Sequence, residues 1–366
     1  MAIENERETA RVPWVLTKSG FPVCLIVMKI AVIGCGAIGG TIAATLALNR
    51  HEPHVIEYND EIADRLNRRG LHVRGKKGAF HVQIRAFAGL KKDLGTFDVI
   101  FVTVKNNYLH GVFRQAREYL CKDGVIVTNQ NGIQVLSLTE EFPETKIIAG
   151  AVAYNAEILE YGEYLVRSEG GITYGALGAA NRDDVFILKS LLEPKIAVDD
   201  TDNIRGMLWS KLLIVCGVTG LGGVAGMLVG RMLKQRVARQ LFYRIITEGA
   251  LIAGKLGIEL EKLPGAINPE KFGNHEAGLP LFVRELMLMV VGGVKYRELK
   301  SNFHRDLEQN RRTEVDFLNG ALVEGGARAD VEAPVNRMIV QQIHEIEEGR
   351  RAMGKQNLIE LWDAVQ

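Results

Sequence analysis

Cysteine, proline and tryptophan are scarce in this chain of 366 residues, which contains 4 Cys, 9 Pro and 3 Trp. The cysteines, Cys24, Cys35, Cys121 and Cys216, form no CxxC pair and no cluster with histidine. This spacing excludes a zinc ribbon and a disulfide scaffold, and it favours the reducing cytoplasm. We therefore expect a cytoplasmic protein without a metal site.

An excess of charge of one sign is also missing, because 45 Lys and Arg residues face 44 Asp and Glu residues. Without a strong field we expect neither nucleic acid nor a membrane surface as a partner. No stretch reaches the ~20 uninterrupted apolar residues of a transmembrane helix. The nearest candidate, residues 21–48, is interrupted by Lys29 and by several glycines.

The length predicts two domains, at roughly 150 residues each. Residues 1–27 are charged near their start and lack the pattern of a secretory signal, so we predict a disordered extension. Short apolar strands then alternate with helical stretches, which is typical of a Rossmann-type, doubly wound parallel sheet. Beyond Asn203 the pattern is helical almost to the end. The sequence thus predicts an α/β domain over 28–203 and an all-helical domain over 204–366.

A glycine-rich segment follows the first predicted strand and precedes a helix, the context that a dinucleotide-binding GxGxxG fingerprint requires. Its first glycine permits a tight turn, its second lets the backbone approach a pyrophosphate, and its third lets helix pack on strand. The cofactor's phosphates would lie at the positive end of that helix. The six residues are Gly34, Cys35, Gly36, Ala37, Ile38 and Gly39.

The choice between NAD(H) and NADP(H) is read about 20 residues after the last glycine. That count reaches Asn59, within the acidic segment from Glu57 to Glu61. A carboxylate there hydrogen-bonds a ribose 2′-hydroxyl and repels a 2′-phosphate, so these residues favour NAD(H). Arg65 and Arg68 follow closely enough to leave NADP(H) open.

Reduction of a carbonyl needs a proton donor and groups that orient the substrate. Lys211 is the single charge in the apolar helical stretch 208–216, where burial lowers a lysine pKa toward a useful range. A lysine whose ammonium reaches water gives the same pattern. Glu314 borders an apolar face, and the alternative there is a solvated helix on which Arg312 pairs with Asp316.

Two more candidates follow predicted strands, at the sheet edge where parallel sheets build their sites. Asn131 and Gly132 come after the strand 124–128, although Asn-Gly is also a common turn. Lys105 ends the strand 97–104, where on its own it is an ordinary surface lysine.

Taken together, these segments resemble the ketopantoate reductase (2-dehydropantoate 2-reductase) family over about residues 28–348. The resemblance implies a Rossmann domain and a helical domain with the site in the cleft between them. It also implies reduction of a small 2-oxo acid to a 2-hydroxy acid, usually with NADPH, as in pantothenate biosynthesis. The segments that carry it are the glycine loop, Thr103-Val104-Lys105, Asn131-Gly132, Leu208-Trp209-x-Lys211-Leu212 and Thr313-Glu314-Val315-Asp316-x-x-Asn319-Gly320.

The same resemblance implies roles for single residues. Lys211 would be the general acid toward the keto oxygen, and Glu314 would hold the hydroxyl end of the substrate. Asn131 would lie at the junction of nicotinamide and substrate, and Lys105 on the cofactor side. Further substrate-binding candidates by position are Thr219, Ser301 and Asn302.

Three departures from the family pattern bear on the ligands. Val215 and Thr219 stand where the family has two asparagines. Asn302, with Ser301 beside it, stands where the family has a substrate-binding serine. The acidic segment 57–61 stands where the family has an arginine after the second strand. Each lost amide removes a hydrogen bond worth about 0.5–1.5 kcal/mol. We hypothesise that the reaction class is kept while the substrate is a larger or more apolar 2-oxo acid than ketopantoate.

Two alternatives stay open. Another two-domain dehydrogenase, of the hydroxyacid or opine type, has a similar layout, although the β-hydroxyacid group would want an asparagine shortly after Lys211. A non-catalytic sensor would bind the dinucleotide without turnover. The apolar, glycine-rich helices of the second domain also predict a homodimer.

Overall fold

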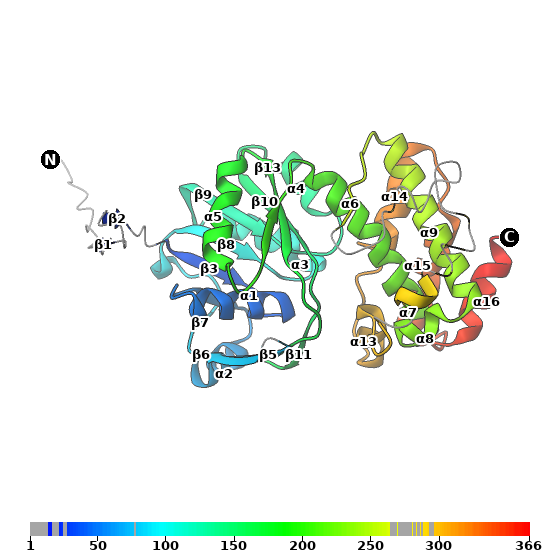
Figure 1. Cartoon of the computed structure of the whole chain (residues 1–366), viewed down its shortest axis with the longest axis horizontal. Coiled ribbons are helices and arrows are strands. Elements are labelled where there is room, and N and C mark those ends of the chain that lie inside the picture. Colours follow the sequence, from blue (N-terminus) through cyan, green and yellow to red (C-terminus); the bar gives the residue numbers. More distant parts are fainter. Residues whose placement is uncertain are drawn as a thin grey trace.

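The computed structural model describes residues 14–16, 22–24, 28–76, 78–263, 269, 280, 283, 286, 288–292 and 296–366. The chain forms an α/β domain and a helical domain side by side, with α6 (Ile204–Val215) between them (Figure 1). Most of the predicted disordered extension, residues 1–27, lies outside the described residues. Its described part is an antiparallel pair of short strands, β1 (Trp14–Leu16) and β2 (Pro22–Cys24).

An eight-stranded sheet forms the centre of the first domain, in the order β14-β13-β10-β9-β8-β3-β4-β7. The strands from β10 to β7 are parallel, which confirms the predicted sheet, whereas β13 pairs with β10 antiparallel. Apolar runs explain the inner strands, because both of their faces are buried. The strands are β3 (Ile30–Ile33), β4 (His54–Glu57), β7 (Arg85–Ala88), β8 (Phe97–Val102), β9 (Leu120–Thr128), β10 (Lys146–Val152), β13 (Ile172–Gly178) and β14 (Val198–Asp200).

A second sheet, in the order β11-β12-β5-β6, packs against α1 and carries Tyr164 beneath the glycine loop. Within it β5 and β6 pair antiparallel, from Leu71 opposite Val82 to Gly75 opposite Gly78. The strands are β5 (Leu71–Gly75), β6 (Gly78–Val82), β11 (Ala156–Glu160) and β12 (Glu163–Val166). The helices of this domain are α1 (Ala37–Leu48), α2 (Asp60–Arg69), η1 (Lys92–Leu94), α3 (Asn106–Arg117), α4 (Val135–Glu141) and α5 (Arg182–Leu192).

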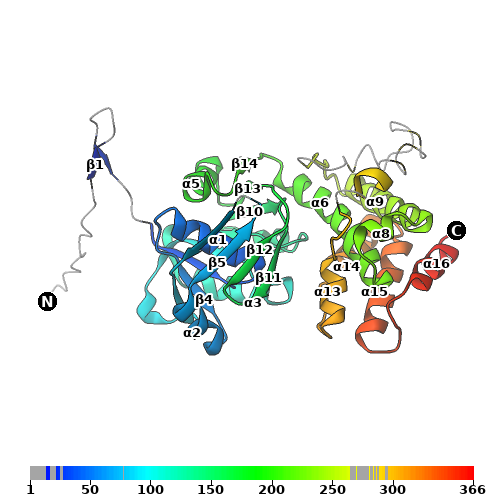
Figure 2. The same ribbon diagram turned by 60° about the horizontal axis from the view of Figure 1, so that its bottom comes forward.

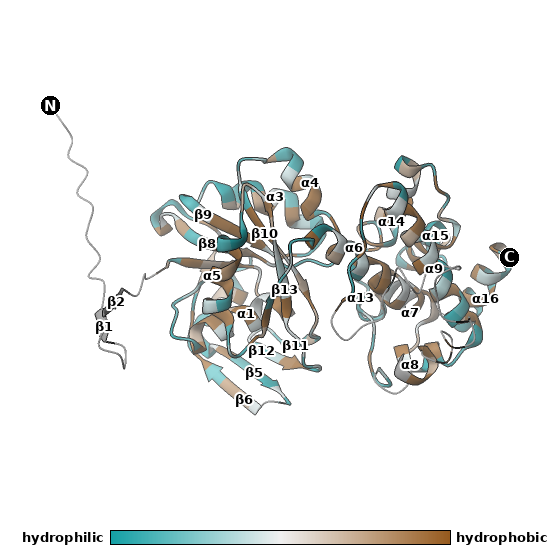
Figure 3. Ribbon diagram, turned by 45° about the horizontal axis from the view of Figure 1, so that its top comes forward, coloured by the Kyte–Doolittle hydropathy of each residue, from teal (hydrophilic) through white to brown (hydrophobic). Residues whose placement is uncertain are grey.

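In the described part of the second domain all regular elements are helices, and the domain has its own apolar core. In Figure 3 hydrophobic residues gather on the inner strands of the sheet and around α7. In two views α13 stands on the side that faces the α/β domain (Figures 1 and 2). After α6 the elements are π-helical η2 (Cys216–Gly220), α7 (Leu221–Ala225), α8 (Val229–Leu233), α9 (Arg236–Lys255), π-helical η3 (Leu288–Gly292), α13 (Asn302–Glu308), α14 (Asn319–Ala329), α15 (Pro334–Glu347) and α16 (Lys355–Ala364).

One stretch of the described residues, Ile204–Ala225, is apolar and long enough to cross a membrane. Of its most apolar window, 78% is buried inside the protein. It is therefore a core helix of the second domain. Among the described residues this stretch comes nearest to a membrane span, whereas part of the stretch 21–48 lies outside them.

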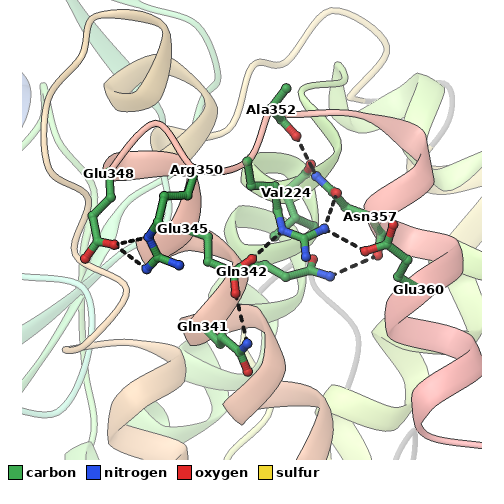
Figure 4. Close-up of polar contacts among 10 residues, drawn as sticks. Val224, Gln341, Gln342, Glu345, Glu348, Arg350, Ala352, Asn357 and Glu360 are labelled. Carbon is green, nitrogen blue, oxygen red and sulfur yellow. Dashed lines mark hydrogen bonds and ion pairs between the residues drawn. The ribbon is translucent and has the colours of Figure 1, made fainter.

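Hydrogen bonds and ion pairs connect the C-terminal helix α16 to α15 and α7 (Figure 4). Arg351 donates to Glu345 at 2.6 Å and to Glu360 at 2.6 Å, and Asn357 donates to the Val224 carbonyl at 2.7 Å. Charge-assisted bonds of this kind are about twice as strong as neutral ones. The network therefore holds the end of the chain on the helical core.

Candidate active site

The glycine loop has the geometry that its sequence predicts. Gly34 has a φ of +91°, and a Cβ added there would lie 2.9 Å from Val104 Cγ1, so that glycine is required. A Cβ on Gly39 would collide with the Gly34 carbonyl and the Thr103 hydroxyl. At Gly36, by contrast, nothing lies within 4 Å of that point. The loop thus leaves open space where a pyrophosphate can approach the first turn of α1.

The last residue of β4, Glu57, lies against this loop. Its carboxylate accepts a hydrogen bond from the Cys35 backbone N–H, and burial raises the pKa of Glu57. Asn59, on which the count from Gly39 falls, is exposed and caps α2 by accepting from Ile62 N at 3.1 Å. The carboxylate at the loop is therefore two residues before the predicted position. The signal that identifies it is the end of the strand.

Lys211 lies in the middle of α6 with only 8% of its surface exposed. Burial lowers its pKa from 10.5 to about 8. Within the described residues no carboxylate or hydrogen-bond partner offsets this desolvation. The side chain of Lys211 is therefore largely removed from water, and its ammonium gives up its proton more readily than that of an exposed lysine.

Glu314 is held at the first turn of α3. Its Oε1 accepts from the backbone N–H of Asn106 and from Asn106 Nδ2, each at 2.9 Å. The same Nδ2 donates to the carbonyl of Asn131 at 2.8 Å. Burial raises the pKa of Glu314, while the bonds from Asn106 and the charge of Lys105 oppose that rise. The structure thus brings together Glu314, Asn131 and Asn106, from both domains.

The segment around Glu314 is not the solvated helix of the alternative interpretation. Residues 311–318 form an irregular turn, and α14 begins only at Asn319. Asp316 pairs with His344 Nε2 at 3.0 Å and not with Arg312. Since the i,i+4 spacing requires a helix, that expected pair has no structural basis.

Two ion pairs also join the domains. Lys105 Nζ lies 2.9 Å from Asp306 Oδ2, and Arg305 lies 2.9 Å from Glu157 of β11. Both partners from the helical domain belong to α13. Lys105 is thus placed between the glycine-loop edge of the sheet and α13, which is compatible with a cofactor-side position.

The remaining substrate candidates are spread around α7 and α13. Ser301 caps α13 by accepting from His304 N at 3.3 Å, and it is packed on Gly222. Asn302 is exposed. Thr219 donates its hydroxyl proton to the Val215 carbonyl at 2.7 Å, within the helix. Their contact with a substrate stays a prediction.

The turn at Gly132 lies close to both segments that carry Lys211 and Glu314. Leu208, three residues before Lys211, lines a small cavity together with Gly132. A Cβ on Gly132 would lie 3.1 Å from the Phe317 carbonyl, so this turn touches the segment after Glu314. Within the described residues no hydrogen bond or ion pair joins Lys211 directly to Glu314. Their action on one substrate therefore stays a prediction.

Comparison with known proteins identifies the family. The model of ketopantoate reductase PanE/ApbA matches residues 30–179, and that of its C-terminal part matches residues 203–347. The chain belongs to the ketopantoate reductase family. As a member it is an oxidoreductase of the 2-dehydropantoate 2-reductase type, a 2-oxo acid reductase, with a nicotinamide dinucleotide as cofactor.

The relatives of this ketopantoate reductase family member are distant but span its length. The 2-dehydropantoate 2-reductase of Archaeoglobus fulgidus is 21% identical over 324 residues, which are 88% of this chain and 99% of the relative. The ketopantoate reductase structure from Ralstonia eutropha has a TM-score of 0.74 at 19% identity, covering 89% and 100% of the two chains. A D-mandelate dehydrogenase with NADH and anilino(oxo)acetate also has a TM-score of 0.74, at 21% identity and 88% and 99% coverage. These structures share the fold.

Proposed function

We propose that this enzyme reduces a 2-oxo acid with an apolar side chain, using NADH, with Lys211 as the proton donor. The observation that carries the proposal is the buried side chain of Lys211, which has no hydrogen-bond or ion-pair partner among the described residues and whose pKa is lowered to about 8. Such a group is protonated at neutral pH and releases its proton readily, as a general acid must.

The residues of this chain divide the reaction among them. A nicotinamide dinucleotide held at the glycine loop would supply the hydride that the keto carbon needs. The Lys211 ammonium donates its proton to the keto oxygen as the C–O double bond becomes an alcohol. The charged ammonium also stabilises the negative charge that develops on that oxygen. Glu314 accepts a hydrogen bond from the substrate, and Asn131 lies where substrate and nicotinamide meet.

An apolar substrate side chain suits the helix that carries Lys211. Val215 stands one turn beyond the lysine, and the hydroxyl proton of Thr219 is already donated to the Val215 carbonyl. This wall offers fewer free donors than the two asparagines of the family pattern. The D-mandelate dehydrogenase of the same fold binds anilino(oxo)acetate, whose aryl group supports a substrate of this kind.

Glu57 supports NADH over NADPH. A carboxylate at the end of β4, beside the Cys35 N–H, is placed to accept from a ribose 2′-hydroxyl and repels a 2′-phosphate. Arg65, which could favour NADPH, is paired with Glu160. The homodimer and the cytoplasmic location rest on the sequence alone and stay predictions.

The test is a panel of 2-oxo acids assayed with NADH and NADPH in parallel, followed by absorbance of the reduced nicotinamide. We expect aryl or branched 2-oxo acids with NADH to give the largest kcat/KM. A kcat/KM above about 10⁴ M⁻¹s⁻¹ for ketopantoate, the lower end for ordinary enzymes, would contradict the substrate proposal and favour pantothenate biosynthesis. NADH binding without turnover of any 2-oxo acid would support the non-catalytic sensor.

A further inference from the structure

We propose that Asn106 is a positioning residue that orients Glu314 and keeps it ionised across the domain boundary. The inference rests on the proposed role of Glu314 in binding substrate. Asn106 is outside the segments that resemble the family, and its side chain touches neither of the reacting groups.

The hydrogen bonds of Asn106 leave one oxygen of Glu314 available. The backbone N–H and the side-chain Nδ2 of Asn106 both donate to Oε1 of Glu314, at 2.9 Å each. Within the described part of the chain, Oε2 accepts no hydrogen bond. The carboxylate is therefore fixed by one oxygen and can present the other to a ligand.

The amide of Asn106 also fixes Asn131. Its two Nδ2 protons are divided between Glu314 Oε1 and the Asn131 carbonyl, at 2.9 and 2.8 Å. Glu314 comes from the helical domain, and Asn131 from the end of β9. One side chain thus sets the distance between two predicted site residues from different domains.

The burial of Asn106 indicates that the hydrogen bonds donated by its N–H groups keep its side chain at the domain boundary. The residue is 2% exposed, and its Oδ1 is buried without a hydrogen-bond partner among the described residues. An unpaired buried oxygen is unfavourable, so the donor side must offset it. Asn106 is also the first residue of α3, whose N-terminal partial charge favours a carboxylate.

The charged groups that face Glu314 act in opposite directions. Lys105, the residue before α3, lowers the pKa of Glu314, and Asp306, from α13, raises it. Burial raises it further. Because donors stabilise the ionised form, removing Asn106 Nδ2 raises the pKa of Glu314.

The experiment compares Asn106→Ala with Asn107→Ala, since Asn107 is the exposed neighbour in the same turn of α3. The pH dependence of kcat/KM is measured for each. For Asn106→Ala we expect the acid limb, where Glu314 must be ionised, to move upward by about one pH unit. Asn107→Ala should keep the wild-type profile. A uniform loss of rate in Asn106→Ala with an unmoved limb would show a merely structural role and overturn the proposal.

A second measurement does not depend on turnover. A double-mutant cycle of Asn106→Ala and Glu314→Gln, read by urea unfolding at several pH values, gives the coupling between the two side chains. We expect a stabilising coupling near neutral pH that weakens in acid, where Glu314 is protonated. Absence of coupling at every pH would overturn the proposal even if the enzyme is active. A wild-type enzyme inactive on all 2-oxo acids would instead refute the proposed function.

Discussion

Replacing Lys211 by methionine should make the protein more stable and nearly inactive. The folded state holds the pKa of Lys211 at about 8, against an ordinary 10.5, because the side chain is buried without a partner among the described residues. One pH unit corresponds to 1.36 kcal/mol, so the buried charge costs about 3 kcal/mol at neutral pH. Methionine fills a similar volume without the charge. We therefore expect the free energy of unfolding to rise by up to about 3 kcal/mol at pH 7.

The gain should depend on pH in a defined direction. Below pH 8 Lys211 is protonated in both states, and the full cost of burial is present. Between pH 8 and 10.5 the unfolded chain binds more protons than the folded one, so wild-type stability rises with pH. The difference between wild type and Lys211→Met should therefore shrink across this interval and vanish above it. Urea unfolding of the cofactor-free proteins at pH 7, 9 and 10.5 measures it.

Activity should move the other way. Loss of a general acid typically lowers the rate 10²–10⁴-fold, and the fall in wild-type activity above about pH 8 should disappear in the variant. Lys255→Met, on the exposed face of α9, is the matched control and should change neither quantity. A Lys211→Met protein that is less stable at pH 7 yet equally active would refute the reasoning, because the ammonium would then be favourably paired and chemically idle.

Two further predictions concern the cofactor. Glu57→Gln removes the charge that repels a 2′-phosphate, so the ratio of kcat/KM for NADPH to that for NADH should rise about tenfold, as for loss of a charged hydrogen bond; an unchanged ratio would mean that Glu57 does not face the ribose. Gly36→Val fills the open space above α1, where no protein atom lies within 4 Å of the added Cβ, so NADH affinity should fall at least about tenfold while the free energy of unfolding changes by no more than about 0.5 kcal/mol, as at an uncrowded surface site. NADH fluorescence titration measures this affinity, and unchanged binding would place the pyrophosphate elsewhere.

Local pattern was sufficient to predict the sheet and the glycine loop. The inner strands are continuous apolar runs, and the GxGxxG spacing lies within one βαβ unit, although the atoms that crowd Gly34 and Gly39 include Thr103 and Val104, which follow β8. The loop can therefore be recognised from local sequence, even though its packing partners are distant in the chain. Lys211 could also be predicted from local sequence, because a single charge in an apolar helical stretch stands out without knowledge of the elements that pack against it.

The position of the ribose-binding carboxylate was harder to predict. A count from Gly39 reaches Asn59, but β4 ends at Glu57 and the next residues turn into α2, where Asn59 is needed as the cap. The count from the glycine loop assumes a fixed number of residues in the intervening helix and loops. The position of the carboxylate is set instead by where β4 ends in the sheet. Strand geometry therefore decides which side chain faces the loop.

The surroundings of Glu314 could not be read from its neighbours in sequence. Its hydrogen-bond donor, Asn106, is 208 residues away in the sequence. The other acceptor of Asn106, the carbonyl of Asn131, is 25 residues from Asn106. Helical periodicity also failed here, because the 311–318 turn is shaped by its contacts with α3 and the Asn131-Gly132 turn and not by its own propensity. A carboxylate in this position would be unfavourable in isolation, since burial raises its pKa. Where the two domains meet, α3 supplies the donors that oppose this rise, so the same domain contact both buries Glu314 and provides the hydrogen bonds that offset its burial.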